Sequence, residues 1–460
     1  MPSLVGSEMC IRDRPNTFNP MQRLHFYAAV FITPLLITLT LSGIAYLFFP
    51  EVENQLYKHE FYGQSEHTKQ QSMTDAIKQI EKEHPGYTIN KVSVMESPYN
   101  NRITIGDMEG NSYYIFLDNH NQIVDQQNVK YTYSNMVRSI HSSLSTENTA
   151  INYLVELTAC WTVFMILSGI YMLVRKKLLK SNNKVLKFQK WHAIVGLIIA
   201  IPMLILVFTG LPWSGFMGAK INQISTAYPQ LGQTQLVANP PKSEANEIPW
   251  ALRQKAAPQS EGGGHHGSMA MPMTNIPGQL SLDKVIHNAE KQGLTRPFAI
   301  VYPTSPDGSF TLSKASNSGV TGFDVAPEKE TTRYMDQYTG KQLGKVDYQD
   351  YGILAKWLTW GIPLHEGHLF GMANKIINLL VCIAFLGGII FGFMSWFRRL
   401  KHMKQAEMLP RRVKKPMSIS LIITLIILGV LMPLFGFSLI IVFIIETLLY
   451  FKDKRNKQLN

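Results

Sequence analysis

The stretch KWHAIVGLIIAIPMLILVFTG, residues 190–210, decides the fold class of this chain. After His192 it runs without a charged side chain to Gly210. About 20 apolar residues are enough for a helix to cross the hydrocarbon core of a bilayer. An amphipathic helix of a soluble protein would interrupt such a run with charged side chains every few positions. The stretch therefore predicts a membrane-spanning helix that begins beside a histidine.

Residues 24–43, LHFYAAVFITPLLITLTLSG, repeat this plan. His25 precedes Gly43 by as many positions as His192 precedes Gly210, and each run has a proline near its middle. Both copies are followed by a long polar segment and a second apolar run. This order predicts a tandem repeat whose two halves cross the bilayer in the same direction, related by an axis along the membrane normal.

The predicted fold class is a membrane α-helical bundle of four core transmembrane helices in tandem repeat, with a C-terminal helical hairpin and two α+β domains outside. The alternative for the hairpin is one long kinked helix. Residues 3–14, SLVGSEMCIRDR, resemble a translated adapter sequence. The predicted boundaries are a disordered N-terminus at 1–17, transmembrane helices at 18–50, 149–176, 190–213 and 371–398, outside domains at 51–148 and 214–370, basic loops at 177–189 and 399–416, the hydrophobic hairpin at 417–451 and a basic tail at 452–460.

The formal net charge of +12 has a placement that argues against a nucleic-acid partner. Lysine and arginine gather in the two short loops between helices and in the tail. All three clusters fall on one side if the helices alternate, as expected for cytoplasmic loops. Both termini are then predicted to be cytoplasmic and the two long polar segments to lie outside.

Each long polar segment reads as an amphipathic helix followed by strands of alternating polarity. The first such helix is expected near SMTDAIKQIEKE and the second near SLDKVIHNAEKQ. Residues 232–280 are rich in proline, glycine and serine, which predicts a flexible loop inside the second outside domain.

Four histidines lie at predicted helix ends in a symmetrical pattern. His25 and His192, the inner pair, begin the two outward-going helices, and His141 and His365, the outer pair, precede the two returning helices. Two imidazoles that face one another in an apolar bundle suit a haem with two axial histidines. The alternative is that these histidines lie in the headgroup zone of the membrane and bind no metal. Zinc, with His365, His368 and Glu366, is a weaker alternative, because zinc prefers three or four clustered ligands.

Four basic residues near these histidines are candidates for pairing with haem propionates, and ordinary snorkelling to the interface is the alternative. They are Arg23, Arg138, Lys190 and Lys375.

A second metal-binding pattern lies in the stretch GGGHHGSMAMPM, residues 262–273. Imidazole and thioether ligands together favour copper, especially Cu(I). The alternative is a low-complexity loop without a ligand. The candidate copper ligands are His265, His266, Met269, Met271 and Met273.

The stretches RLHFYAAVFITPLLITLTLSGIAYLFFPEVE, SIHSSL, WHAIVGLIIAIPMLILVFTG and PLHEGHLFGMANKIINLLV, taken together, resemble the PepSY-associated transmembrane helix family, which includes iron-regulated membrane proteins and ferric-siderophore reductases. The resemblance covers about residues 18–400. It implies two b-type haems held by His25, His192, His141 and His365, two PepSY-like domains in the periplasm, and a place in the bacterial inner membrane. His368 occupies what looks like a variable position. The histidine- and methionine-rich loop and the hairpin after 416 depart from the family pattern.

The function expected on these grounds is transmembrane electron transfer to a periplasmic ferric chelate, with a quinol or a cytoplasmic reductase as donor. The chain carries no Gly-x-Gly-x-x-Gly motif for a nicotinamide cofactor and no Cys-x-x-Cys-His motif for covalent haem attachment. The alternatives are a cupric reductase that uses the His/Met loop and a non-enzymatic, membrane-anchored PepSY binding or inhibitory module. A transporter would normally need charged residues at mid-membrane, and the four core helices show none there.

Overall fold

The computed structural model forms two compact units. The helical unit comprises Met1–Leu41, Glu147–Gly218 and Leu379–Asn460, and the sheet unit comprises Ser42–Thr146 and Ala219–Asn378. The structure describes residues 20–67, 69–146, 148–176, 187–228, 231, 272–274, 276–304, 308–315, 319–401 and 419–458. The predicted N-terminal segment 1–17 and most of the loops at 177–189, 232–280 and 399–416 lie outside these residues.

Four helices among the described residues are long and apolar enough to cross a membrane, as the sequence predicts. Their apolar spans are Met21–Leu47, Thr149–Val174, Lys187–Trp213 and Gly371–Arg398. They belong to α1 (Pro20–Leu47), α6 (Thr149–Lys176), α7 (Lys187–Gly210) and α11 (Gly371–Lys401). The protein is therefore a membrane protein.

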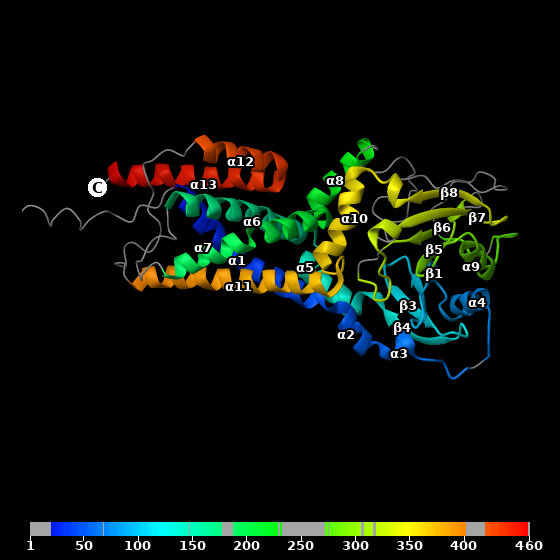
Figure 1. Cartoon of the computed structure of the whole chain (residues 1–460). Helices are drawn as coiled ribbons and strands as arrows, with labels where there is room; N and C mark the ends of the chain where they lie inside the picture. The colour runs from blue at the N-terminus through cyan, green and yellow to red at the C-terminus, as the bar shows by residue number, and fades with distance from the viewer. Residues whose placement is uncertain are drawn as a thin grey trace, which may run out of the picture. The chain divides into compact units, whose positions relative to one another are not determined.

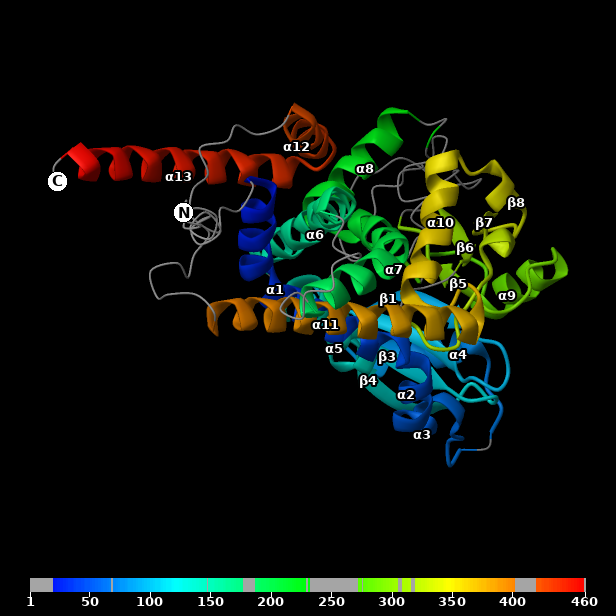
Figure 2. The ribbon, with the colours of Figure 1, turned by 60° about the vertical axis from the view of Figure 1, so that its left-hand side comes forward.

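The C-terminal hydrophobic region forms two helices, α12 (Ile419–Leu431) and α13 (Pro433–Gln458), which lie side by side (Figure 1 and Figure 2). They approach closely where Gly429 faces Gly436, because a Cβ added to Gly436 would lie 2.7 Å from the Gly429 carbonyl oxygen. Phe435 packs against Trp161 of α6 with ring centroids 4.7 Å apart, and the Trp161 indole donates a 3.0 Å hydrogen bond to Ser438 Oγ. The two helices thus extend the core that α1 and α6 build.

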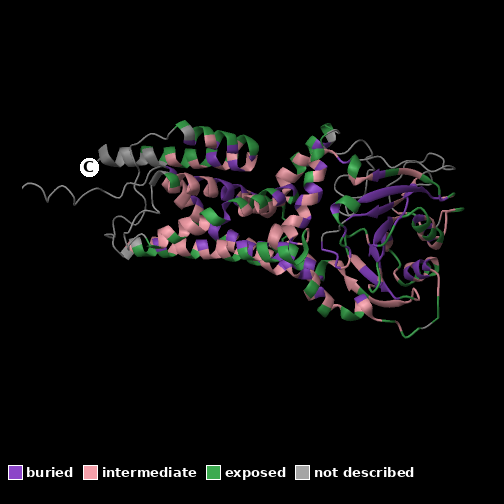
Figure 3. Ribbon diagram, viewed as in Figure 1, coloured by how far each residue is buried: buried purple, intermediate pink, exposed green. Residues whose placement is uncertain are grey.

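The helices α7 and α11 leave most of their apolar side chains outside this core. In the most apolar windows only 22% of α7 and 17% of α11 is buried, against 39% of α6. The exposed apolar residues of these helices include Ile198, Ile201 and Leu380. Figure 3 shows how buried, intermediate and exposed residues alternate along the helices. Exposed aliphatic side chains on helices of this length are stable in contact with lipid chains.

The sheet unit contains one eight-stranded antiparallel sheet in the order β4-β3-β2-β1-β5-β6-β7-β8 (Figure 1). Each polar segment supplies strands after its amphipathic helix, as the alternating pattern predicts, and the structure shows four consecutive strands in each. The first gives β1 (Thr88–Val94), β2 (Asn101–Gly106), β3 (Ser112–Leu117) and β4 (Ile123–Asn128), and the second gives β5 (Phe298–Val301), β6 (Ser309–Lys314), β7 (Thr331–Asp336) and β8 (Gln342–Asp347).

The two segments form one continuous sheet. The sequence analysis, by contrast, expects two separate α+β domains. Strands β1 and β5 pair at the centre, with Val92 opposite Ile300, so the two halves share one ladder. The pairing satisfies backbone groups that would otherwise form two exposed sheet edges.

One face of this sheet is covered by α4 (Met73–Glu83) and α9 (Leu282–Lys291), the two amphipathic helices that the sequence predicts (Figure 1). Asp283 in the first turn of α9 accepts hydrogen bonds from the backbone N–H groups of Met73 and Thr74, at 2.8 and 3.0 Å, and from the Thr74 hydroxyl. Partial burial raises the pKa of Asp283, but these hydrogen bonds outweigh it and leave the pKa below its ordinary value. The contacts join the two halves of the unit.

Short helices connect the sheet to the ends of the membrane spans. After α1 come α2 (Phe49–Leu56), with Pro50 in its first turn, and α3 (Lys58–Tyr62). The helix α5 (Tyr133–Ser143) precedes α6, α8 (Gly215–Ala227) follows α7, and α10 (Ile353–Glu366) precedes α11. Two of the four candidate histidines lie on these connecting helices.

Candidate functional site

The inner histidine His25 lies in α1 and faces a small-residue pair of α6. Its Nδ1 atom is 2.8 Å from the hydroxyl oxygen of Ser168. A Cβ added to the adjacent Gly169 would lie 3.7 Å from Cε1 of His25. The serine therefore gives the ring a polar partner, and the glycine allows α6 to lie close to the ring.

The inner histidine His192, in α7, is held in the same way by α11. Its Nδ1 atom is 2.7 Å from the carbonyl oxygen of Gly388. Since a carbonyl oxygen only accepts, Nδ1 must carry the proton, and Nε2 of the neutral ring is left with a free lone pair. A Cβ added to Gly392 would lie 3.3 Å from Nδ1.

The outer histidines His141, in α5, and His365, in the last turn of α10, come together in the sheet unit. Their ring centroids are 6.2 Å apart, with 68° between the ring planes. Nδ1 of His141 is 3.0 Å from the hydroxyl oxygen of Ser42, and a Cβ added to Gly43 would lie 3.4 Å from Cε1 of His141. A second Ser-Gly pair thus holds a second histidine.

The donor set fits bis-histidine binding of a haem iron. Three of the four rings have Nδ1 within hydrogen-bonding distance of a polar oxygen, and contacts of this kind orient histidine ligands in metalloproteins. The rings of His141 and His365 are neighbours, with centroids 6.2 Å apart, so the two side chains could act on one metal ion.

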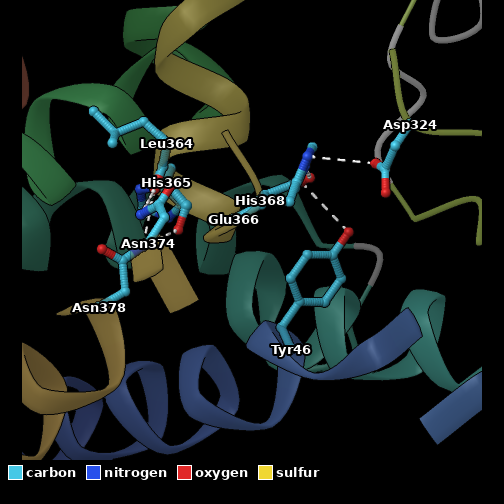
Figure 4. A network of polar contacts seen from close by, with 8 residues as sticks. All are labelled: Tyr46, Asp324, Leu364, His365, Glu366, His368, Asn374 and Asn378. Atoms are coloured by element: carbon cyan, nitrogen blue, oxygen red, sulfur yellow. Dashed lines mark hydrogen bonds and ion pairs between the residues drawn. The ribbon is translucent and has the colours of Figure 1, made fainter. Parts of the chain in front are cut away.

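The segment that carries His365 is fixed by polar contacts (Figure 4). The Asn378 side chain donates to the backbone carbonyls of Leu364, at 2.9 Å, and of His365, at 3.2 Å. The Asn374 side chain donates to the Leu364 carbonyl at 3.2 Å. These bonds satisfy carbonyl groups that the last turn of a helix leaves without partners. They hold the end of α10 against the beginning of α11.

His368 lies beside this segment between two carboxylates (Figure 4). Its Nε2 atom is 3.1 Å from Oε2 of Glu366 and its Nδ1 atom is 3.4 Å from Oδ1 of Asp324. Burial lowers the pKa of His368, but the hydrogen bond and charge of Glu366, together with the charge of Asp324, outweigh burial and raise the pKa. Glu366 also accepts a 3.4 Å hydrogen bond from the Tyr46 hydroxyl. Among the described residues, no group of three or more histidine, cysteine or acidic side chains is arranged so that it could hold a metal ion.

Three of the basic side chains considered for propionates have protein partners. Arg23 forms an ion pair with Glu446 of α13, and Lys375 forms one with Glu51 of α2. Arg138 donates to the Asn135 side chain. These bonds are sufficient to account for the positions of the three side chains without a ligand.

The copper candidates His265, His266, Met269 and Met271 lie outside the described residues. Met273 is described, and its backbone N–H donates to the carbonyl of Pro303 at 2.8 Å.

Sequence reasoning does not identify two buried carboxylates that shape these helices. Glu156, seven residues into α6, is 2% exposed and accepts from the backbone N–H groups of Phe216, at 2.8 Å, and Met217, at 3.1 Å, at the start of α8. Glu156 therefore lies inside a membrane-spanning helix, about two turns from its N-terminal end. Its carboxylate caps the N-terminus of α8. Glu53 of α2 is 3% exposed and accepts from the backbone N–H of Ser134 in α5. Neither position has a local pattern that would reveal a partner so far along the chain.

No curated protein matches this chain. The family model of the PepSY-associated TM region matches residues 22–399, a range that contains all four spanning helices, the whole sheet and the four histidines. The chain therefore belongs to the PepSY-associated TM region family.

Proposed function

We propose that this protein is a haem-dependent electron-transfer protein of the bacterial inner membrane that reduces a ferric chelate on the periplasmic side. One b-type haem would be held by the inner pair, His25 and His192, and one by the outer pair, His141 and His365. The observation that supports this proposal best is the shared use of Nδ1 in hydrogen bonds at His25, His141 and His192. A haem bound by two histidines supplies one-electron chemistry.

The surroundings of each histidine prepare it to bind a metal. A hydrogen bond to Nδ1 fixes the ring orientation and makes Nε2 a stronger donor. The glycines beside His25, His141 and His192 bring a neighbouring helix close to the ring. The helices α1 and α6 also share a buried apolar cluster that includes Trp161 and Phe164. The apolar surroundings of a metal centre contribute to its potential.

The proposed topology follows from the basic loops. The two termini and the loops at 177–189 and 399–416 would face the cytoplasm, and the sheet unit would lie in the periplasm. The helices would form a tandem repeat of two spans each, followed by a hairpin that the family pattern does not include. The electron donor would then be a membrane quinol or a cytoplasmic reductase.

The first experiment is haem quantification in the purified protein and in five single variants. We expect two haems per chain and sharp absorption bands on reduction. His25→Ala and His192→Ala should each remove the same one haem, and His141→Ala and His365→Ala should each remove the other. The control His287→Ala changes an exposed histidine of α9 and should retain both haems. A colourless wild-type protein would favour the non-enzymatic binding or inhibitory module.

The second experiment identifies the acceptor. Proteoliposomes with a reductant inside and either ferric citrate or cupric ion outside are compared for the rate of metal reduction. We expect faster reduction of ferric citrate, and loss of that reduction in His141→Ala. Replacement of His265, His266, Met269, Met271 and Met273 by serine should leave the rate with iron unchanged. Preferential reduction of copper that this replacement abolishes would support the cupric reductase instead.

A further inference from the structure

A buried carboxylate holds the helix that carries His141. Glu53 of α2 accepts a 2.9 Å hydrogen bond from the backbone N–H of Ser134, in the first turn of α5, through Oε1. Its Oε2 accepts a 2.6 Å hydrogen bond from the Thr321 hydroxyl. His141 lies seven residues after Ser134, about two helical turns along the same helix. The first turn of α5 and the His141 ring therefore belong to one continuous helix.

Thr321 belongs to a segment, residues 319–325, that follows β6 in the second half of the sheet unit. The carbonyl of Gly319 accepts a 2.9 Å hydrogen bond from the Ser134 hydroxyl. A Cβ added to Gly319 would lie 3.4 Å both from Arg138 of α5 and from the Tyr46 hydroxyl. Further along, Asp324 pairs with His368, three residues after His365. The 319–325 segment thus touches the elements that carry both outer histidines.

The charge of Glu53 has a specific buried counterpart. Arg102 of β2 is 3% exposed, and its charge interacts with that of Glu53. Its guanidinium donates to the Thr321 carbonyl at 3.2 Å and lies over the rings of Phe61 and Phe116, at 5.0 and 5.2 Å. Glu53, Arg102 and Thr321 therefore form one polar unit, and its position is fixed by packing.

We infer that Glu53 and Thr321 are positioning residues for the outer histidine pair, and this inference rests on the proposed function. They set the separation of His141 and His365 by tying α2, α5 and the 319–325 segment together. The second half of the sheet is in this way connected to the outer pair without contributing a ligand.

The test compares Glu53→Ala, Thr321→Val and the control Asp283→Ala in the full-length protein. Asp283 is a suitable control because it is also a carboxylate that accepts from the N-terminal N–H groups of a helix, α4, and that helix carries no candidate ligand. Each variant is examined by haem stoichiometry, by redox titration that resolves the two haems, and by electron paramagnetic resonance of the ferric state. Hydrogen exchange of the α5 amides is measured in addition, since it does not depend on haem.

We expect Glu53→Ala to weaken or shift the outer signal, the one that His141→Ala abolishes, and to leave the inner signal unchanged. Thr321→Val should shift the outer signal in the same direction by less, and both variants should speed exchange in α5. Asp283→Ala should leave both signals and α5 unchanged. The inference is overturned if Glu53→Ala leaves the outer signal unchanged, or if it changes both signals equally. A wild-type protein without haem would refute the proposed function, and exchange in α5 would still show whether Glu53 holds the helix.

Discussion

The hydroxyl oxygen of Ser168 in α6 lies 2.8 Å from Nδ1 of His25 in α1, and the hydroxyl oxygen of Ser42 bears the same relationship to Nδ1 of His141, at 3.0 Å. Each serine directly precedes a glycine. The serines of the two Ser-Gly pairs are thus the polar partners of two candidate ligands. His192 receives the equivalent contact from a backbone carbonyl, that of Gly388.

The serine contacts should tune haem retention. Loss of an outer-shell partner of a metal ligand typically lowers metal affinity by about 10–100-fold. We expect Ser168→Ala to speed release of the inner haem about tenfold, and Ser42→Ala to do so for the outer haem. Transfer of haem to an acceptor apoprotein measures both rates. The control Ser438→Ala removes a hydroxyl that bonds Trp161 instead of a histidine and should change neither rate.

The glycines of α11 allow a comparison between a crowded and an open position. A Cβ added to Gly392 would press on the His192 ring at 3.3 Å, whereas one added to Gly387 would meet nothing within 4 Å. We expect Gly392→Ala to displace the ring and shift the potential of the inner haem. Gly387→Ala should leave the potential unchanged and should favour the helix by up to about 1 kcal/mol. Equal potentials in the two variants would contradict close packing of α11 against the His192 ring.

The contact between Asp283 and α4 should make stability depend on acid. The folded-state pKa of Asp283 lies below its ordinary value, so its contribution is complete above the ordinary pKa and is lost as the pH falls through the lowered one. We expect Asp283→Ala to reduce the free energy of unfolding by about 1 kcal/mol at pH 7. Thermal unfolding in detergent is measured at pH 7 and at progressively lower pH. The difference in stability between Asp283→Ala and wild type should become smaller as the pH falls below the ordinary pKa of aspartate. A difference that does not depend on pH would show that the charge of Asp283 has no part in it.

The close approach of α12 and α13 should matter for stability and not for haem binding. A side chain at Gly436 would collide with the Gly429 backbone, and overpacking of this kind costs about 1–3 kcal/mol. We expect Gly436→Leu to lower the unfolding temperature while both haems are retained. The control Gly196→Leu, at a position with nothing within 4 Å, should have a smaller effect. Loss of the inner haem in Gly436→Leu would show that these helices help to form the inner site.

Some features of the architecture could be predicted from the sequence because their signals are local. An uncharged run such as 190–210 has one stable environment, a bilayer, and the helices α4 and α9 are indicated by their amphipathic period. The union of the two halves could not be predicted. The ladder between Val92 and Ile300 consists of backbone hydrogen bonds, and these require no particular side chain at either position.

The sequence by itself determined that the protein spans a membrane and that a histidine lies in or shortly before each spanning helix, because length, polarity and residue type are properties of short segments. Only the tertiary structure decided that Ser168 faces His25, that Glu53 caps the helix of His141, and that His141 and His365 are 6.2 Å apart. These relationships depend on how each helix is rotated about its axis. That rotation is set by the packing of residues more than 80 positions apart in the chain, so no short segment contains it.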